Sequence, residues 1–153
     1  VSRTGSVSLN LARDYFKLTP AKEGEKIVYQ LDPLQGPVQQ GDVIAVRLTL
    51  TGGEWRYLLT EDPIPAGAEF IENDNLYELK NRPPWWMTYY SRREFHDDHA
   101  AIFQSYFGGG EVRHTYLLKV VNPGLFKVSP ARVQPMYQPQ YISTTERQLV
   151  EVK

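Results

Sequence analysis

Apolar and polar residues alternate with a period of two along several stretches of this chain. Between Asp42 and Thr51, the residues Ile44, Val46, Leu48 and Leu50 fall on one face and polar residues fall on the other. Side chains of a β-strand point alternately to its two faces. The pattern therefore predicts a strand in a sheet that has one buried and one solvent-facing side.

A second strand is predicted directly after a Gly-Gly pair. Trp55, Tyr57 and Leu59 alternate there with Arg56 and Thr60. Two alternating runs around a glycine-rich turn are typical of a β-hairpin. We therefore expect these two strands to pair, with Trp55, Tyr57 and Leu59 on one face of the second strand.

Five more strands are predicted from alternation or from short apolar runs between turn signals. They are Ser91–Phe103, Val112–Val121, Leu125–Val128, Ala131–Tyr137 and Gln148–Val152. A hairpin turn is expected at the three glycines of residues 108–110, and a compact turn is expected at Asn122-Pro123-Gly124, since proline presets φ and glycine accepts positive φ.

The remaining segments give weaker signals. Glu61–Glu69 carries two prolines and a glycine, which predicts neither a central strand nor a helix. Residues 73–87 are expected to form an extended loop or an excursion at a sheet edge, and only Asp98–Ser105 has the composition of a brief helix.

These elements predict the fold class. About seven or eight short strands separated by turns argue for an all-β domain, an antiparallel β-sandwich. The 153 residues suit one domain. We expect residues 1–8 to be a linker or a non-native remnant and residues 9–153 to form the domain.

Composition narrows the function classes. The net charge is -1, so no basic field is available for nucleic acid, and no apolar run is long enough for a membrane helix. Cysteine is absent, which removes disulfides and a cysteine nucleophile from this chain. The motifs of nucleotide-binding loops, serine hydrolases and zinc proteases are also missing. We therefore expect no catalytic residues, no cofactor, no nucleic-acid partner and no direct membrane insertion by this domain.

One run of residues has metal-ligand chemistry, namely His96-Asp97-Asp98-His99. On a strand, its two histidines would point to opposite faces, and on a helix only the histidines would share a face. A structural role, such as capping a turn or pairing with an arginine, is favoured over a metal site, although a metalloenzyme remains an alternative.

A cluster of aromatic residues offers a second candidate site. Trp85, Trp86, Tyr89 and Tyr90 have the composition of a stacking platform for sugars or single-stranded nucleic acid. Aromatic residues are equally common where one protein surface meets another. The alternatives are therefore a free-standing carbohydrate- or ligand-binding module and an interdomain interface, with packing favoured.

Two stretches resemble the C-terminal, macroglobulin-like (MG10-type) domain of the bacterial α2-macroglobulin family. Tyr57–Phe70 reads YLLTEDPIPAGAEF, similar to that family's Asp-Pro and Pro-Ala-Gly segment. Arg93–Tyr137 is similar to its double-aspartate strand, its glycine-containing hairpin and its Pro-Ala…Met-Tyr ending. His96 and His99 depart from the pattern, since the family more often carries arginines around the paired aspartates.

The resemblance implies a fold and a function. The fold is a macroglobulin-like sandwich with immunoglobulin-like architecture. The function is a non-catalytic part in protease trapping, that is, endopeptidase inhibition, by a large protein of the periplasm or cell envelope. The partners implied are other domains of the same polypeptide and, through the whole protein, target proteases.

The resemblance also implies candidate site residues. A loop of this domain can shield the reactive region of a neighbouring domain, and by position the candidates for that lock loop are Pro135, Met136 and Tyr137. An apolar loop with a tyrosine hydroxyl can exclude water and still form a hydrogen bond. The alternative is that Met136 and Tyr137 fill the edge of their own domain.

Overall fold

The fold is known from a computed structural model, which describes residues 8–72, 77–79 and 90–153. Over these residues it contains twelve strands and one short 3-10 helix, η3, at Pro139–Tyr141. The first sheet has the order β2 (Lys26–Pro33), β1 (Leu9–Glu23), β3 (Val43–Gly52), β8 (Gly110–Val120) and β5 (Ala68–Ile71). The second has the order β11 (Ser143–Thr144), β10 (Arg132–Pro135), β4 (Trp55–Pro63), β7 (His99–Phe107) and β6 (Arg92–Phe95).

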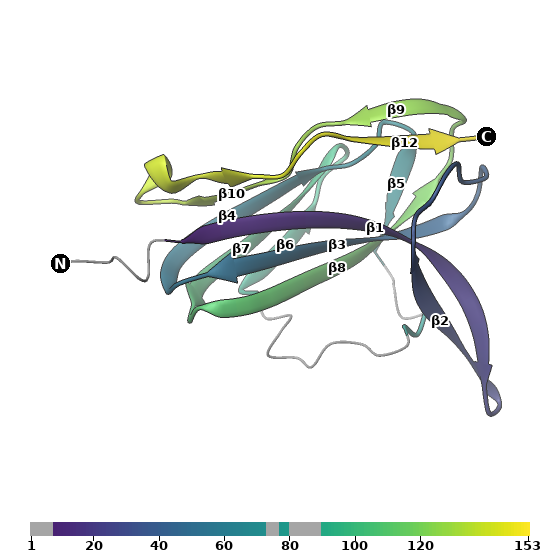
Figure 1. The fold of residues 1–153 in the computed structure, drawn as a ribbon, viewed down its shortest axis with the longest axis horizontal. Coiled ribbons are helices and arrows are strands. Elements are labelled where there is room, and N and C mark those ends of the chain that lie inside the picture. Colours follow the sequence, from purple (N-terminus) through teal and green to yellow (C-terminus); the bar gives the residue numbers. More distant parts are fainter. Residues whose placement is uncertain (1–7, 73–76, 80–89) are drawn as a thin grey trace.

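A third, two-stranded sheet pairs β12 (Gln148–Val152) with β9 (Gly124–Val128). All pairs between these strands are antiparallel. Figure 1 shows the two larger sheets lying one behind the other, with β9 and β12 along one side. The predicted all-β, antiparallel β-sandwich is therefore confirmed.

The core lies between the two larger sheets. The alternating residues of β3, Ile44, Val46, Leu48 and Leu50, are fully buried, as their pattern predicts. On β8, Tyr116, Leu118 and Val120 face the same core. Removal of this apolar surface from water is the main stabilising contribution.

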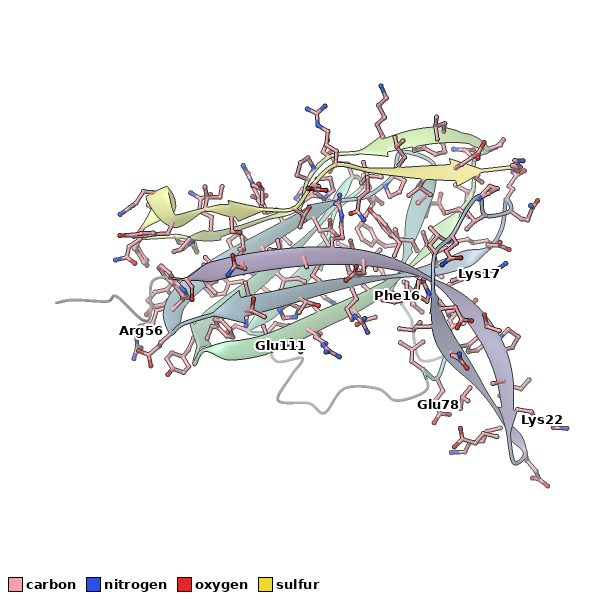
Figure 2. The ribbon with its side chains drawn as sticks, viewed as in Figure 1. Phe16, Lys17, Lys22, Arg56, Glu78 and Glu111 are labelled. Carbon is pink, nitrogen blue, oxygen red and sulfur yellow. The ribbon has the colours of Figure 1, made fainter. Side chains whose placement is uncertain are left out.

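The predicted number of strands was too low. The structure adds β1 and β2 before the first predicted strand, and their hairpin reaches beyond the sandwich (Figures 1 and 2). The alternation of β1 breaks where Tyr15 and Phe16 are both buried, because Tyr15 faces the main core whereas Phe16 joins a smaller cluster. That change of face removed the period-two signal.

Two predicted hairpins are wrong. The Gly-Gly turn joins β3 to β4, and the glycines of residues 108–110 join β7 to β8, but in both cases the two strands belong to different sheets. These turns are corners of the sandwich. A glycine-rich turn between two alternating runs is equally compatible with a corner, and only the partners of β3, which are β1 and β8, distinguish the two.

Three further expectations need correction. Glu61–Pro63 belongs to β4, a central strand of its sheet. The strand can include a proline there because Pro63 is its last paired residue. The predicted strand Ser91–Phe103 is two strands, β6 and β7, joined by a tight turn. Asp98–Ser105 lies largely in β7, so it is strand and not helix.

Candidate functional site

The chain leaves β10 through an exposed apolar loop. Pro135 is buried at the end of the strand, whereas Met136 is 48% exposed and Tyr137 is 78% exposed. Large apolar side chains at this level of exposure, when they cluster, mark surfaces that contact other molecules. The three residues that the resemblance implies therefore divide into one internal anchor and two outward side chains.

Specific contacts hold this loop in place. The backbone N–H of Met136 donates to the carbonyl oxygen of Tyr57 at 2.8 Å, and that of Gln138 donates to Pro135 at 3.2 Å. The rings of Tyr57 and Tyr137 meet edge to face, with centroids 5.3 Å apart and planes at 90°. This is a favourable geometry for two aromatic rings. The loop is exposed and yet fixed.

The backbone of Tyr57 is strained. Its φ of 57° lies in the left-handed region, where a residue with a Cβ costs roughly 1–2 kcal/mol. The alternation of β4 changes there: Trp55 faces inward, and so do Leu58 and Thr60, whereas Tyr57 is 40% exposed. The prediction that Trp55, Tyr57 and Leu59 share a face is therefore wrong, because the left-handed residue shifts the phase.

Beside Met136 lies a hollow of about 530 Å³ on the outer face of the second sheet. Leu59, Ala101 and Phe103 are among its apolar lining residues. Arg92 and Glu94 also line it and pair with each other at 3.1 Å, so their charges largely compensate. A hollow of this composition suits an apolar side chain.

Several residues of this surface were not singled out from the sequence. Tyr141, in η3, packs its ring against Trp55 at 5.5 Å, and it and Ile142 are partly exposed. Leu59 and Phe103 belong to alternating runs, but alternation alone does not reveal which face is covered. Tyr57 had no sequence signal, since a positive φ is unusual for tyrosine.

Of the predicted aromatic cluster, Trp85, Trp86 and Tyr89 lie outside the described residues. Tyr90 is described and partly exposed. The Arg93 guanidinium lies 5.3 Å from the centre of its ring, and the His114 ring lies 6.1 Å away. Tyr90 is thus in contact with protein groups, and among the described residues no ring contact joins it to Tyr137 or Tyr141 of the segment after β10.

His96-Asp97-Asp98-His99 forms the tight turn between β6 and β7. The His96 N–H donates to the His99 carbonyl at 2.9 Å, and the two imidazoles stack with centroids 4.7 Å apart. His99 Nδ1 lies 2.7 Å from Asp98, a contact that lowers the pKa of that carboxyl. Within residues 8–72, 77–79 and 90–153, no group of three or more potential ligands has the geometry to hold a metal ion.

The Asp-Pro of the family-like segment lies at the centre of the fold. Asp62 is fully buried; it accepts a 2.7 Å hydrogen bond from Arg13 and another from the Tyr116 hydroxyl. Burial raises the pKa of Asp62, and Arg13 and Tyr116 oppose that rise. Arg13 also donates to Gln148 at 2.6 Å, so the network joins β1, β4, β8 and β12. With no solvent access, Asp62 has a structural role.

The Pro-Ala-Gly of the same segment is also explained by packing. A Cβ on Gly67 would lie 2.4 Å from the ring of Phe126 and 3.0 Å from the carbonyl oxygen of Asn122. The Gly67 carbonyl accepts hydrogen bonds from Val121 and Asn122 at 2.7 and 3.2 Å. The motif therefore allows a close approach between the start of β5 and the corner between β8 and β9.

No helix in the described part of the chain is long and apolar enough to cross a membrane.

Comparison with known proteins identifies the family. A family model, the bacterial alpha-2-macroglobulin MG10 domain, matches residues 9–140. The alpha-2-macroglobulin of Thermotoga maritima is 33% identical over 106 residues, which cover 65% of this chain and 7% of that protein. That of Xylella fastidiosa strain 9a5c is 30% identical over 120 residues, covering 68% and 7%. The chain thus spans about 7% of the length of these relatives.

Solved structures of relatives share the fold. Native alpha-2-macroglobulin of Escherichia coli, from domain MG7 to the C-terminus, superposes with a TM-score of 0.75 at 21% identity, over 95% of this chain and 23% of that one. Salmonella alpha-2-macroglobulin reacted with methylamine gives 0.73 at 22% identity, over 97% and 9%. Trypsin-activated Escherichia coli alpha-2-macroglobulin gives 0.71 at 22% identity, over 95% and 10%. With the family model matching most of the chain, these findings lead to one conclusion: the chain belongs to the MG10 domain family of bacterial alpha-2-macroglobulins.

Proposed function

We propose that this chain is one domain of a longer alpha-2-macroglobulin polypeptide in the envelope of a bacterium, with the periplasm as its compartment. In this proposal it contributes to the trapping of proteases by docking onto another domain of the same polypeptide. It performs no catalysis and needs no cofactor, and target proteases meet the whole protein, not this domain alone. The small share of the relatives' length that the chain covers supports this proposal.

The observation that carries the proposal is the fixed but uncovered loop at Met136 and Tyr137. A tyrosine that only filled the edge of its own domain would be expected to bury most of its ring, yet Tyr137 is 78% exposed. Its position is nevertheless set by Tyr57 and by backbone hydrogen bonds. A preformed apolar projection reduces the ordering cost of docking.

The solved relatives support a rigid role for the domain. The fold described here superposes at similar TM-scores on a native, a methylamine-reacted and a trypsin-activated relative. A domain whose fold is the same in those three proteins suits a body that docks and undocks as a unit. The docking surface we propose comprises Tyr57, Met136, Tyr137 and the hollow over Leu59 and Phe103.

We further propose that residues 9–153 form the domain, which extends beyond the match at 9–140. Val150 and Val152 of β12 are buried in the main core, and Gln148 is held by Arg13. A chain ending at residue 140 would leave β9 without its partner strand.

Fractionation of source cells, followed by an immunoblot with antibody raised against this domain, tests the proposal. We expect a band many times heavier than 17.6 kDa in the periplasmic or membrane fraction, which becomes shorter when a protease is added. A soluble band near 17.6 kDa would contradict it. Saturable quenching of tryptophan fluorescence by an oligosaccharide would instead support the carbohydrate-binding alternative.

A further inference from the structure

Tyr57 has an unusual backbone for its residue type. Among the described residues other than glycine, it is the one with a positive φ, and it lies inside a strand that pairs on both sides. Strained residues persist only where their surroundings fix them, and they occur preferentially at functional sites.

The surroundings of Tyr57 do fix it. Trp55, two residues before, is buried and donates from its indole N–H to the Ser8 carbonyl at 3.0 Å. Leu58, the next residue, is completely buried. With both flanks anchored in the core, the chain between them cannot relax into regular extended geometry without withdrawing one of these side chains.

The strained backbone has one consequence for the surface. Alternation counted from Trp55 would turn the Tyr57 side chain inward, whereas in the structure it points outward, in phase with the inward-facing Leu58. There its ring meets the ring of Tyr137, and its carbonyl accepts the N–H of Met136. Ring and backbone of one residue therefore support both exposed residues of the loop.

We propose that Tyr57 is the positioning residue of the docking surface, holding the Met136–Tyr137 loop in the conformation that docks onto a neighbouring domain of the same polypeptide. This inference rests on the proposed function and adds to it a residue that makes the loop preformed. The left-handed backbone also lets Trp55 and Leu58 stay buried together, and carrying it on a residue with a Cβ costs stability that glycine at the same position would not cost.

The first test uses the 153-residue chain with Tyr57→Gly, in which glycine accepts the same φ but lacks the ring. We expect its urea midpoint to equal or exceed that of the unaltered chain. The NMR shifts of the Tyr137 ring protons should move toward those of a free tyrosine. Tyr57→Phe should keep the shifts. As a matched control, Tyr106→Gly removes an exposed tyrosine from the extended strand β7 and should lower the midpoint. A Tyr57→Gly midpoint that falls as far as that of the control would overturn the proposal.

The second test uses the longer polypeptide and the rate at which hydrogen peroxide oxidises Met136, read by mass spectrometry of its peptide. We expect Tyr57→Gly to raise this rate about two- to tenfold, the factor that corresponds to loss of one aromatic pair. Tyr57→Phe should leave it unchanged. Rapid oxidation in the unaltered polypeptide would refute docking itself. Slow oxidation that persists in Tyr57→Gly would refute only the role of Tyr57.

Discussion

Asp62 shows how a residue that resembles a site can belong to the core. Its carboxylate and the Arg13 guanidinium have fully buried side chains and are 2.7 Å apart, with Tyr116 as a third partner. A buried pair of this kind adds little net stability over apolar residues, but removing one partner leaves an uncompensated charge. The Asp-Pro of the family-like segment is therefore best explained by the network that joins four strands.

We expect Asp62→Ala to lower the free energy of unfolding by about 3–5 kcal/mol, because Arg13 would remain buried without its partner. Urea denaturation of the purified chain measures this loss. Asp98→Ala removes a carboxylate that is exposed at the β6–β7 turn and should have a far smaller effect. Equal losses in the two variants would show that the buried pair has no special role.

We expect His114 to make the stability of the domain dependent on pH. Burial and, to a smaller extent, the charge of Arg93 lower its pKa from 6.5 to about 4. The unfolded chain therefore binds this proton at a higher pH than the folded one does, and stability falls as the pH decreases from about 6.5 to about 4. The full effect corresponds to about 3 kcal/mol.

Urea denaturation at a series of pH values tests this expectation. Because carboxyl groups also titrate in this range, the comparison is with His114→Gln, which cannot take up the proton. The difference in stability between the two proteins should change with pH between 6.5 and 4. If the two curves stay parallel, His114 does not supply this dependence.

At the scale of elements, the corner between β8 and β9 depends on the absence of a side chain at Gly67. A methyl group there would collide with Phe126, whose ring is part of the packing around the main core. We expect Gly67→Ala to cost about 1–3 kcal/mol in urea denaturation, the usual range for overpacking. Ala66→Ser, at the exposed neighbouring position, should have almost no effect. A tolerated Gly67→Ala would mean that Phe126 can turn aside freely.

The strands were predicted best where they are regular. β3 and β8 keep their core-facing residues in one phase along their length, so both their positions and their core faces follow from the pattern, although Ala45 and Leu117 are also buried, in the smaller cluster. β1 changes face at Tyr15 and Phe16, and β4 changes phase at Tyr57. Neither change has a local sequence signal, because both depend on strands that are distant in the sequence. Whether the strands on either side of a glycine-rich turn pair with each other or lie in different sheets likewise depends on distant partners.

The candidate site was predicted only in part. The resemblance pointed to Met136 and Tyr137, but no pattern in the sequence pointed to Tyr57 or to the hollow over Leu59 and Phe103. That hollow exists because outward side chains of β4 and β7 become neighbours across the second sheet, which is a property of the pairing. Conversely, His96 and His99 attracted attention by composition, and the structure places them at a turn.

At the scale of the whole molecule, the proposed docking surface lies at the end of the sandwich where the described chain begins. The Ser8 carbonyl accepts hydrogen bonds from Trp55 and Gly53, and Trp55 contacts Tyr141. Figure 1 shows β1 starting at the same end of the sandwich as that at which β10 finishes. The described chain thus begins at the same end of the sandwich as the exposed loop, which is compatible with the proposed docking within one polypeptide.

The most direct measurement compares the oxidation of Met136 by hydrogen peroxide in the 153-residue chain and in the longer polypeptide. As an internal reference, Leu149→Met places a second methionine at an exposed position of β12, away from the loop. We expect Met136 to oxidise about tenfold or more slowly in the longer polypeptide, as loss of solvent access in a docked interface implies, while the residue at 149 reacts at the same rate in both proteins. Equal rates for Met136 in the two proteins would contradict docking through this loop.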